Sequence, residues 1–157
     1  MNFAKNTDQD RTQISIKIID INNDGKNEIL LSDEDIPSSN SDEGRIACYD
    51  HTKRIIWKYN LRDSTSTFRA WTNSYNISII DTLTINEKTI LFLMSRNTPN
   101  FPSAVFKLDI GTGKRVDSLN TLWNAGTINN GLIGDFNEDG EAELVLAGVH
   151  NGFQRAM

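Results

Sequence analysis

Short apolar runs recur along this chain between clusters of Asn, Asp, Gly and Ser. Apolar residues spaced at the helical period are nearly absent, whereas short runs rich in Ile, Val, Leu, Phe and Thr are typical of β-strands. The pattern therefore predicts an all-β fold. The predicted strands are residues 14–19, 28–32, 45–49, 54–59, 67–71, 77–80, 89–94, 104–108, 115–117, 131–134 and 143–147.

The order of these runs repeats along the chain. One strand ends at Asp20, a loop and a second strand follow, and a later strand leads into a turn that begins at Asp50. Asp81 and Asp109 occupy the same places in a second unit, and a third unit begins with the strand before Asp135. Repeating units of about four strands and this length are typical of β-propeller blades.

We therefore expect blades of four-stranded antiparallel sheets, about two and a half in number. The blade units are expected at approximately residues 12–72, 73–128 and 129–157, the last one incomplete. Rings close with roughly four to eight blades, and an open set exposes strand edges that invite pairing with another chain. Our leading interpretation is a partial β-propeller that is a piece of a longer ring. An oligomer that completes the ring and an open stack are the alternatives.

Two loops between predicted strands carry regularly spaced oxygen ligands. Each has Asp, Asn and Asp at positions 1, 3 and 5, Gly at position 6 and Glu at position 9. Ca²⁺ prefers about six to eight oxygen ligands, and alternate residues of a tight loop can direct theirs to one centre. The predicted ligands are Asp20, Asn22, Asp24, Lys26 and Glu28 in one loop and Asp135, Asn137, Asp139, Glu141 and Glu143 in the other. Lys26 and Glu141 would contribute backbone carbonyls.

These loops have two alternative interpretations. An EF-hand needs a bidentate Glu at position 12 and flanking helices, but position 12 is Leu31 in one loop and Leu146 in the other, and β runs flank both. A plain Asn/Asp/Gly turn without metal is the remaining alternative. The loop after Asp81 lacks the glycine and the spaced oxygens, so the middle unit is expected to bind no calcium. Calcium is therefore expected to rigidify loops, with no part in defining the fold.

The two loops and their flanking strands resemble a known family. Residues 18–31 read Ile-Ile-Asp-Ile-Asn-Asn-Asp-Gly-Lys-Asn-Glu-Ile-Leu-Leu, and residues 133–148 repeat this pattern. Both resemble the FG-GAP/VCBS-type repeats of integrin-α-like β-propellers, which implies a calcium loop between the first two strands of a blade. The turns at 49–53 and 108–114 are similar to those of quinoprotein-type blades, with Trp57 in the place of a tryptophan that follows the turn. The literal Phe-Gly and Gly-Ala-Pro signatures of the family are absent.

Charge and hydropathy narrow the function classes. The 157 residues carry a net charge of −5, and no cluster of Lys and Arg suits a nucleic-acid partner. No apolar run reaches the length of about 18 residues that a membrane-spanning helix needs, and no secretory signal begins the chain. Extracellular modules bind calcium at about 0.1 to 1 mM, so an extracytoplasmic location is expected, with any signal outside this chain.

No catalytic constellation is apparent. His51 and His150 have no motif that links them to a nucleophile or a zinc site, so we expect surface histidines and a function other than catalysis. The expected function is a calcium-stabilised scaffold for protein or glycan binding and adhesion, completed by the remaining blades or a partner subunit. The alternative is a set of scaffold blades in an extracytoplasmic enzyme, either a polysaccharide lyase or a quinoprotein-like dehydrogenase.

Several other features have competing interpretations. Cys48 lies in an apolar run and is expected to be a buried thiol. The aromatic residues between 57 and 75 are expected to be blade-packing core, with a sugar- or peptide-stacking platform as the alternative. The acidic segment at 33–43 is expected to be a solvated loop or a ligand-contact loop. The Asn76-Ile-Ser78 sequon is attributed to chance.

Overall fold

The computed structural model describes residues 15–32, 44–61, 65–66, 71–72, 75–97, 102–116, 121–124 and 126–149, with only the backbone at 65–66, 71–72 and 149. Within these residues the chain forms β-strands and turns and no helix, which confirms the all-β prediction. Every strand pairing between named strands is antiparallel. A Trp-containing ribbon, β5 (Thr65–Ser66) with β6 (Trp71–Thr72), connects the two larger sheets in sequence.

Two four-stranded sheets have the same topology, in which consecutive strands are neighbours. Sheet 1 contains β1 (Ser15–Ile19), β2 (Glu28–Ser32), β3 (Arg45–Tyr49) and β4 (Ile55–Asn60). Sheet 2 contains β7 (Tyr75–Ile85), β8 (Lys88–Asn97), β9 (Ser103–Asp109) and β10 (Leu122–Asn124). A third hairpin pairs β11 (Thr127–Gly134) with β12 (Glu143–Val149).

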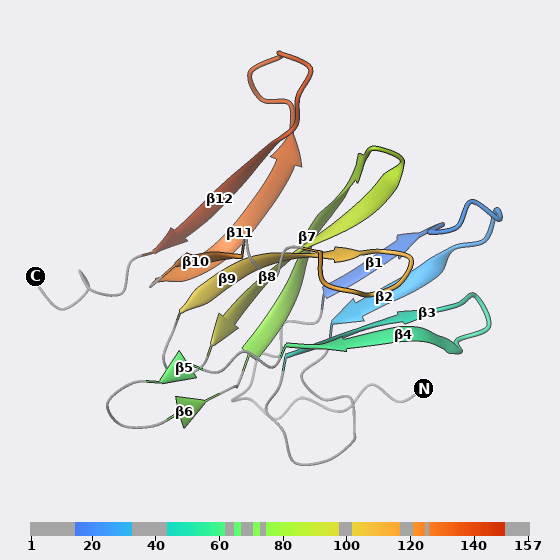
Figure 1. The fold of residues 1–157 in the computed structure, drawn as a ribbon, viewed down its shortest axis with the longest axis horizontal. Coiled ribbons are helices and arrows are strands. Elements are labelled where there is room, and N and C mark those ends of the chain that lie inside the picture. Colours follow the sequence, from blue (N-terminus) through green and yellow to red (C-terminus); the bar gives the residue numbers. More distant parts are fainter. Residues whose placement is uncertain are drawn as a thin grey trace, which may run out of the picture.

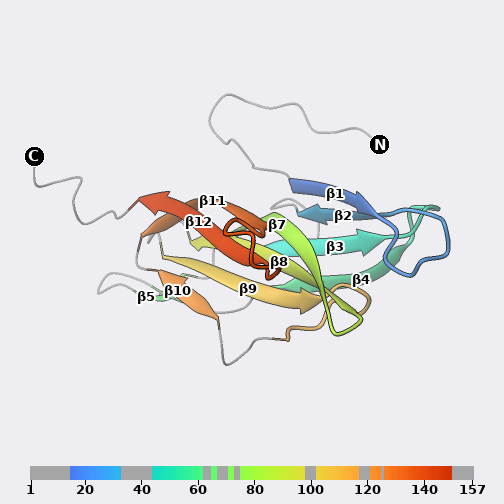
Figure 2. The ribbon, with the colours of Figure 1, turned by 90° about the horizontal axis from the view of Figure 1, so that it is seen from above.

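The two sheets and the third hairpin lie side by side in the order of the sequence (Figures 1 and 2). The turns that join β1 to β2, β7 to β8 and β11 to β12 project toward the same end of the molecule, at the top and right of Figure 1. The third hairpin begins at Thr127, so the expected unit boundary at 128/129 falls inside β11. Within the described residues, the structure therefore confirms antiparallel sheets of four strands.

The last strand of sheet 2 differs from the prediction. The predicted strand at 115–117 is wrong in its described part, because Arg115 makes only an isolated bridge with Leu108 and the fourth strand is β10. The Arg115 guanidinium lies 5.0 Å from the Phe106 ring centroid and donates to the Tyr59 hydroxyl at 3.3 Å. The Arg115 side chain therefore packs against sheet 1 at the point where the backbone stops pairing with β9. The predicted strand at 67–71 falls mostly outside the described residues.

The middle unit has a tight hairpin where the sequence analysis expected a loop. β7 and β8 continue to a two-residue turn, Asn86-Glu87, whose φ angles are 48° and 63°. Two consecutive left-handed residues are the hallmark of a type I′ hairpin turn. A β-bulge between Ile79 and Asp81 accommodates the register of these long strands. The middle unit lacks the spaced acidic ligands, and its strands β7 and β8 remain paired up to the two-residue turn.

The main apolar core lies between sheet 1 and sheet 2. Its buried members are Leu30, Ile46, Cys48, Trp57, Leu61, Tyr75, Ile77, Leu91, Leu93, Phe106, Leu108 and Ile110. Cys48 is a free, fully buried thiol, as predicted. Burial, with a smaller contribution from the charge of Glu28, raises the pKa of the Cys48 thiol to about 12. Within the folded protein this thiol is therefore neutral near pH 7.

Trp57 joins the two sheets through the turn after β9. Its indole Nε1 donates to the carbonyl of Ile110 at 2.9 Å. Gly113, with φ of +67°, lies so close that a Cβ there would be 2.5 Å from the indole ring. Trp57 and Tyr75 are buried, and Tyr59 packs against the same core, which confirms the packing interpretation for these three aromatics. The side chains of Phe68 and Trp71 lie outside the described part.

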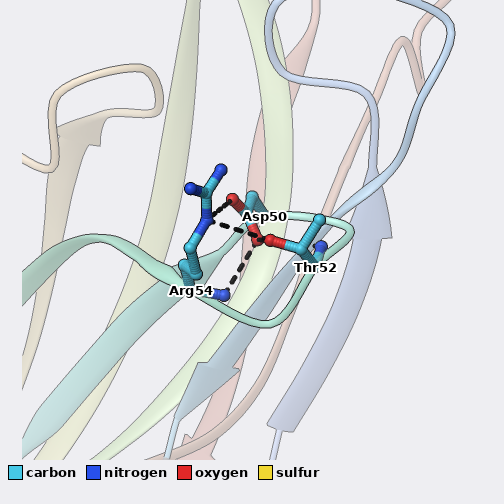
Figure 3. A network of polar contacts seen from close by, with 3 residues as sticks. All are labelled: Asp50, Thr52 and Arg54. Carbon is cyan, nitrogen blue, oxygen red and sulfur yellow. Dashed lines mark hydrogen bonds and ion pairs between the residues drawn. The ribbon is translucent and has the colours of Figure 1, made fainter.

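Matching aspartate turns close the outer hairpins of both sheets. Asp50 Oδ1 accepts hydrogen bonds from the backbone N–H and hydroxyl of Thr52 and from the Arg54 N–H. Figure 3 shows Thr52 and Arg54 gathered around the Asp50 carboxylate. Asp109 Oδ1 accepts the equivalent pair from Thr112, at 2.9 and 2.8 Å. These bonds, the Thr52 hydroxyl first, hold the pKa of Asp50 below its usual range. His51 is exposed in its turn, as expected, whereas His150 lies outside the described residues.

Candidate metal centres

The first acidic loop (residues 20–28) joins β1 to β2, and the second acidic loop (residues 135–143) joins β11 to β12. Both occupy the connection between the first two strands of their unit. Numbering each loop from its first aspartate, positions 1 to 9 hold all ten predicted ligands, five in each loop. The ten residues therefore lie at equivalent places in two different sheets.

The aspartate at position 1 organises each loop. Its Oδ1 accepts the N–H of position 5 at 3.2 Å in the first loop and 3.1 Å in the second. Its Oδ2 accepts the N–H of the glycine at position 6, at 2.8 Å in both loops. Backbone dipoles thus converge on one carboxylate and fold the loop around it.

The polar side chains at positions 3 and 5 continue the same network. The position 3 amide oxygen accepts the N–H of position 5, at 3.0 Å from Asn22 and 2.9 Å from Asn137. The position 5 Oδ1 accepts the N–H of position 7 at 2.8 Å in each loop. Its Oδ2 accepts from the position 3 amide nitrogen, at 3.3 Å in the first loop and 2.9 Å in the second.

The glutamate at position 9 closes each loop onto its own start. Glu28 Oε2 accepts the N–H of Ile21 at 3.0 Å, and Glu143 Oε2 accepts the N–H of Phe136 at 2.8 Å. Both glutamates are the first residues of their strands, so the ladder fixes their backbones. Glu28 is 2% exposed, whereas Glu143 is half-buried.

The loop backbone explains the glycine at position 6. Its φ is +81° at Gly25 and +88° at Gly140, and position 4 is also left-handed, with φ of 58° at Asn23 and 61° at Glu138. A Cβ at either glycine would meet nothing within 4 Å. Backbone conformation, and not space, therefore selects glycine here.

The residues of both loops fit a hard divalent cation. The donors are carboxylate and amide oxygens with a backbone carbonyl at position 7, the oxygen set that Ca²⁺ prefers. Each carboxylate offers about four lone-pair sites, and the turn bonds above leave several of them free. At the second loop, ligand atoms of Asp135, Asp139 and Glu143 all lie within 4.8 Å of one another. Among the described residues, Asp20, Asp24 and Glu28 of the first loop do not form such a group.

Asp81, the counterpart of position 1 in the middle unit, is engaged differently. It forms an ion pair with Lys17 of β1, and its Oδ1 accepts the Thr82 N–H at 2.7 Å. The hydrogen bond from Lys17 is the main reason that the pKa of Asp81 is lowered. This carboxylate therefore links sheet 1 to sheet 2 where the other two units have an acidic loop.

Sequence reasoning missed a polar cavity on the other face of sheet 2. It is lined by residues of β7, β8 and β11, among them Asn76, Ser78 and Arg96. The strand alternation contained the signal: Tyr75 and Ile77 face the apolar core, so Asn76 and Ser78 must share the opposite face. From the sequence we recognised Asn76 only as part of a sequon.

Sheets and loops together define an all-β protein of antiparallel meanders with two matched acidic loops. No protein-family model, curated protein or solved structure matches this chain. The FG-GAP/VCBS-type resemblance therefore stays a prediction. Within the described residues, no helix has the length and apolar character that a membrane span requires.

Proposed function

We propose that this chain is a calcium-binding β-propeller segment that serves as a scaffold for protein or glycan binding, with two structural calcium ions. The observation that carries the proposal is the bond-for-bond agreement of the two acidic loops. Six hydrogen bonds recur at the same positions in two loops whose residues at positions 2, 4, 7 and 8 all differ. The shared residues are those that offer oxygens to a cation, together with the glycine of the turn.

The repeated topology supports the propeller part of this proposal. Sheets 1 and 2 have the same strand order, the third hairpin repeats its first half, and the aspartate turns recur at the same place. Four-stranded meanders packed face to face are the building unit of a propeller. We infer that the chain contributes about two and a half blades of the FG-GAP/VCBS type.

Apolar side chains are exposed at both ends of the row of sheets, on sheet 1 and on the third hairpin. On β1, Lys17 reaches toward sheet 2, and its neighbours Ile16 and Ile18 are 56% and 64% exposed. On the third hairpin, Leu132 and its cross-strand partner Val145 are also exposed. These faces suit coverage by further blades or by a partner subunit, because burying them removes apolar surface from water.

The role of calcium is inferred from where the loops lie. Each loop ties the end of one strand to the start of the next, and in the second loop the carboxylates of Asp135, Asp139 and Glu143 crowd together. A divalent cation would relieve the repulsion between these carboxylates and stiffen the connection. Binding at about 0.1 to 1 mM suits extracytoplasmic fluids, where we place the protein.

One observation favours a second candidate function, a set of scaffold blades in a quinoprotein-like dehydrogenase. Trp57 donates to Ile110 and covers Gly113 at the Asp109 turn, the segment whose sequence resembles quinoprotein-type blades. Catalytic groups would then lie in other blades.

Calorimetric titration with calcium tests the leading proposal. We expect two sites per chain with dissociation constants of about 0.1 to 1 mM, and weaker binding of magnesium, which demands tighter octahedral geometry. Asp20→Asn and Asp135→Asn should each remove one site, while Asp109→Asn, which changes the same charge at a turn outside the loops, should leave both. A chain that takes up no calcium at about 5 mM, or as much after both loop substitutions, would contradict the proposal.

A further inference from the structure

A cavity of about 130 Å³ lies between the start of β7, the end of β8 and the start of β11. Its polar lining includes Asn76, Ser78, Arg96 and Asn129, and its apolar lining includes Met94 and Ile128. The cavity is thus formed where sheet 2 meets the third hairpin, on the face opposite the main core.

Two buried polar atoms in this lining have no hydrogen-bond partner. They are Oδ1 of Asn76 and Nε of Arg96, and the two residues are directly opposite each other in the β7–β8 ladder. One is an acceptor and the other belongs to a permanently charged donor group. Buried polar groups are almost always hydrogen-bonded, so this pair requires partners that the described residues do not supply.

We propose that this cavity binds the head group of a hydroxylated monocarboxylate. A guanidinium presents a planar set of donors that matches a carboxylate, so Arg96 would take the anionic end. The Asn76 oxygen needs a hydrogen-bond donor, which a carboxylate cannot provide, and a hydroxyl group beside the carboxylate would supply it without adding charge. A monoanion is favoured over phosphate, because Arg96 is the one cation in the described lining of a chain whose net charge is −5.

The size of the cavity limits what it encloses. A cavity of about 150 Å³ holds one benzene molecule, which has six heavy atoms. A 2-hydroxycarboxylate such as lactate has that size. The same chemistry also occurs at the edge of a uronic acid, whose carboxylate and nearest hydroxyl would enter while the rest of the ring stays outside.

This inference goes beyond the proposed function and does not depend on calcium. Asn129 lies near the start of β11, and Asp135, the first residue of the second acidic loop, directly follows the end of this strand. Five strand residues lie between Asn129 and Asp135, which places the two roughly 20 Å apart. Loss of calcium binding and loss of carboxylate binding are therefore separate outcomes. A glycan ligand of the scaffold is one source of such a head group.

Calorimetry and amide NMR on the whole chain test the proposal with two probes, L-lactate and D-glucuronate. Each has matched controls: propionate lacks the hydroxyl of lactate, and propane-1,2-diol and D-glucose lack the charge. We expect at least one probe to bind with a dissociation constant of roughly 1 mM, and each control about tenfold more weakly. Amide shifts should be confined to the starts of β7 and β11 and the end of β8.

Substitutions assign the contacts. Arg96→Gln and Asn76→Ala should each weaken binding, the first by at least about tenfold because it removes a charge-assisted bond. Arg54→Gln is the matched control, since it also removes one positive charge but from an exposed side chain at the Asp50 turn, and it should leave affinity unchanged. If Arg96→Gln unfolds the chain, Arg96→Lys, which keeps the charge but lacks Nε, should still weaken binding.

Each result has one meaning. Tighter binding of lactate than of glucuronate assigns a small hydroxy acid, and the reverse order assigns a carboxylated sugar. Failure of both probes to bind at about 50 mM would overturn the proposal, as would affinity unaltered by either Arg96 substitution or shifts that map elsewhere. Equal affinity for propionate and lactate would refute the requirement for a hydroxyl group at Asn76.

Discussion

Replacing Asp135 by asparagine should remove the calcium-dependent part of the stability that the second acidic loop provides. Asp135 accepts two backbone N–H groups, and its carboxylate lies with Asp139 and Glu143 in the tightest acidic group of the described residues. Asparagine keeps one oxygen but loses the negative charge. The substitution therefore preserves part of the turn while removing an anionic ligand.

The size of the effect follows from ligand linkage. With a dissociation constant of about 0.1 to 1 mM and about 5 mM calcium, RT ln(1 + [Ca²⁺]/Kd) is about 1.1 to 2.3 kcal/mol for each site. In a chain of this length that corresponds to a rise in Tm of roughly 2 to 9 °C per ion. Two ions should together raise Tm by about 4 to 18 °C.

Thermal melting with excess EGTA or with calcium measures this quantity. Losing one exposed turn bond at Asp135 costs about 0.5 to 1.5 kcal/mol under both conditions, so the calcium-dependent difference isolates the ion. Asp135→Asn and Asp20→Asn should each remove about half of the wild-type gain, and the double variant nearly all of it, because the loops lie in different sheets.

Asp109→Asn controls for a lost charge, because it alters a turn carboxylate outside both loops. It should keep the full calcium response even if it lowers Tm in EGTA. Two results would refute the reasoning. One is a wild-type Tm that calcium does not raise, and the other is a gain that survives in the double variant.

The packing between sheets 1 and 2 supports two further predictions. Gly113→Ala should destabilise the chain by about 2 to 4 kcal/mol in urea melts, because the new methyl meets the Trp57 ring at a left-handed position. Gly140→Ala, strained but unobstructed, should cost only about 1 to 2 kcal/mol, and an equal cost would contradict the packing argument. The Asp81 pKa is lowered by Lys17, so this pair stabilises the fold above the unfolded pKa of about 3.9 and loses its effect as pH falls through the lower folded value. Lys17→Met should reduce stability by about 0.5 to 1 kcal/mol at pH 7 and by less at pH 2, whereas a loss independent of pH would count against the pair.

Elements whose structure depends on near neighbours in the sequence were predicted well. The strands of sheet 1 agree with the alternation of apolar residues to within a residue or two, and the acidic loops lie where their spacing placed them. The turn at Asn86-Glu87 was missed because Glu seldom adopts a left-handed conformation, so it gives no turn signal. The strand expected at Arg115 failed because that side chain packs across to Tyr59, far away in sequence.

The sequence by itself determined the all-β class, the repeat and the backbone of both acidic loops. The physical reason is locality, since every hydrogen bond that shapes these loops joins residues no more than seven positions apart. Only the tertiary structure decided the contacts between sheets. Trp57 and Ile110 are 53 residues apart, Lys17 and Asp81 are 64 apart, and the cavity beside Arg96 exists only because β11 packs against sheet 2. Such contacts depend on how whole sheets are arranged, which no short stretch of sequence encodes.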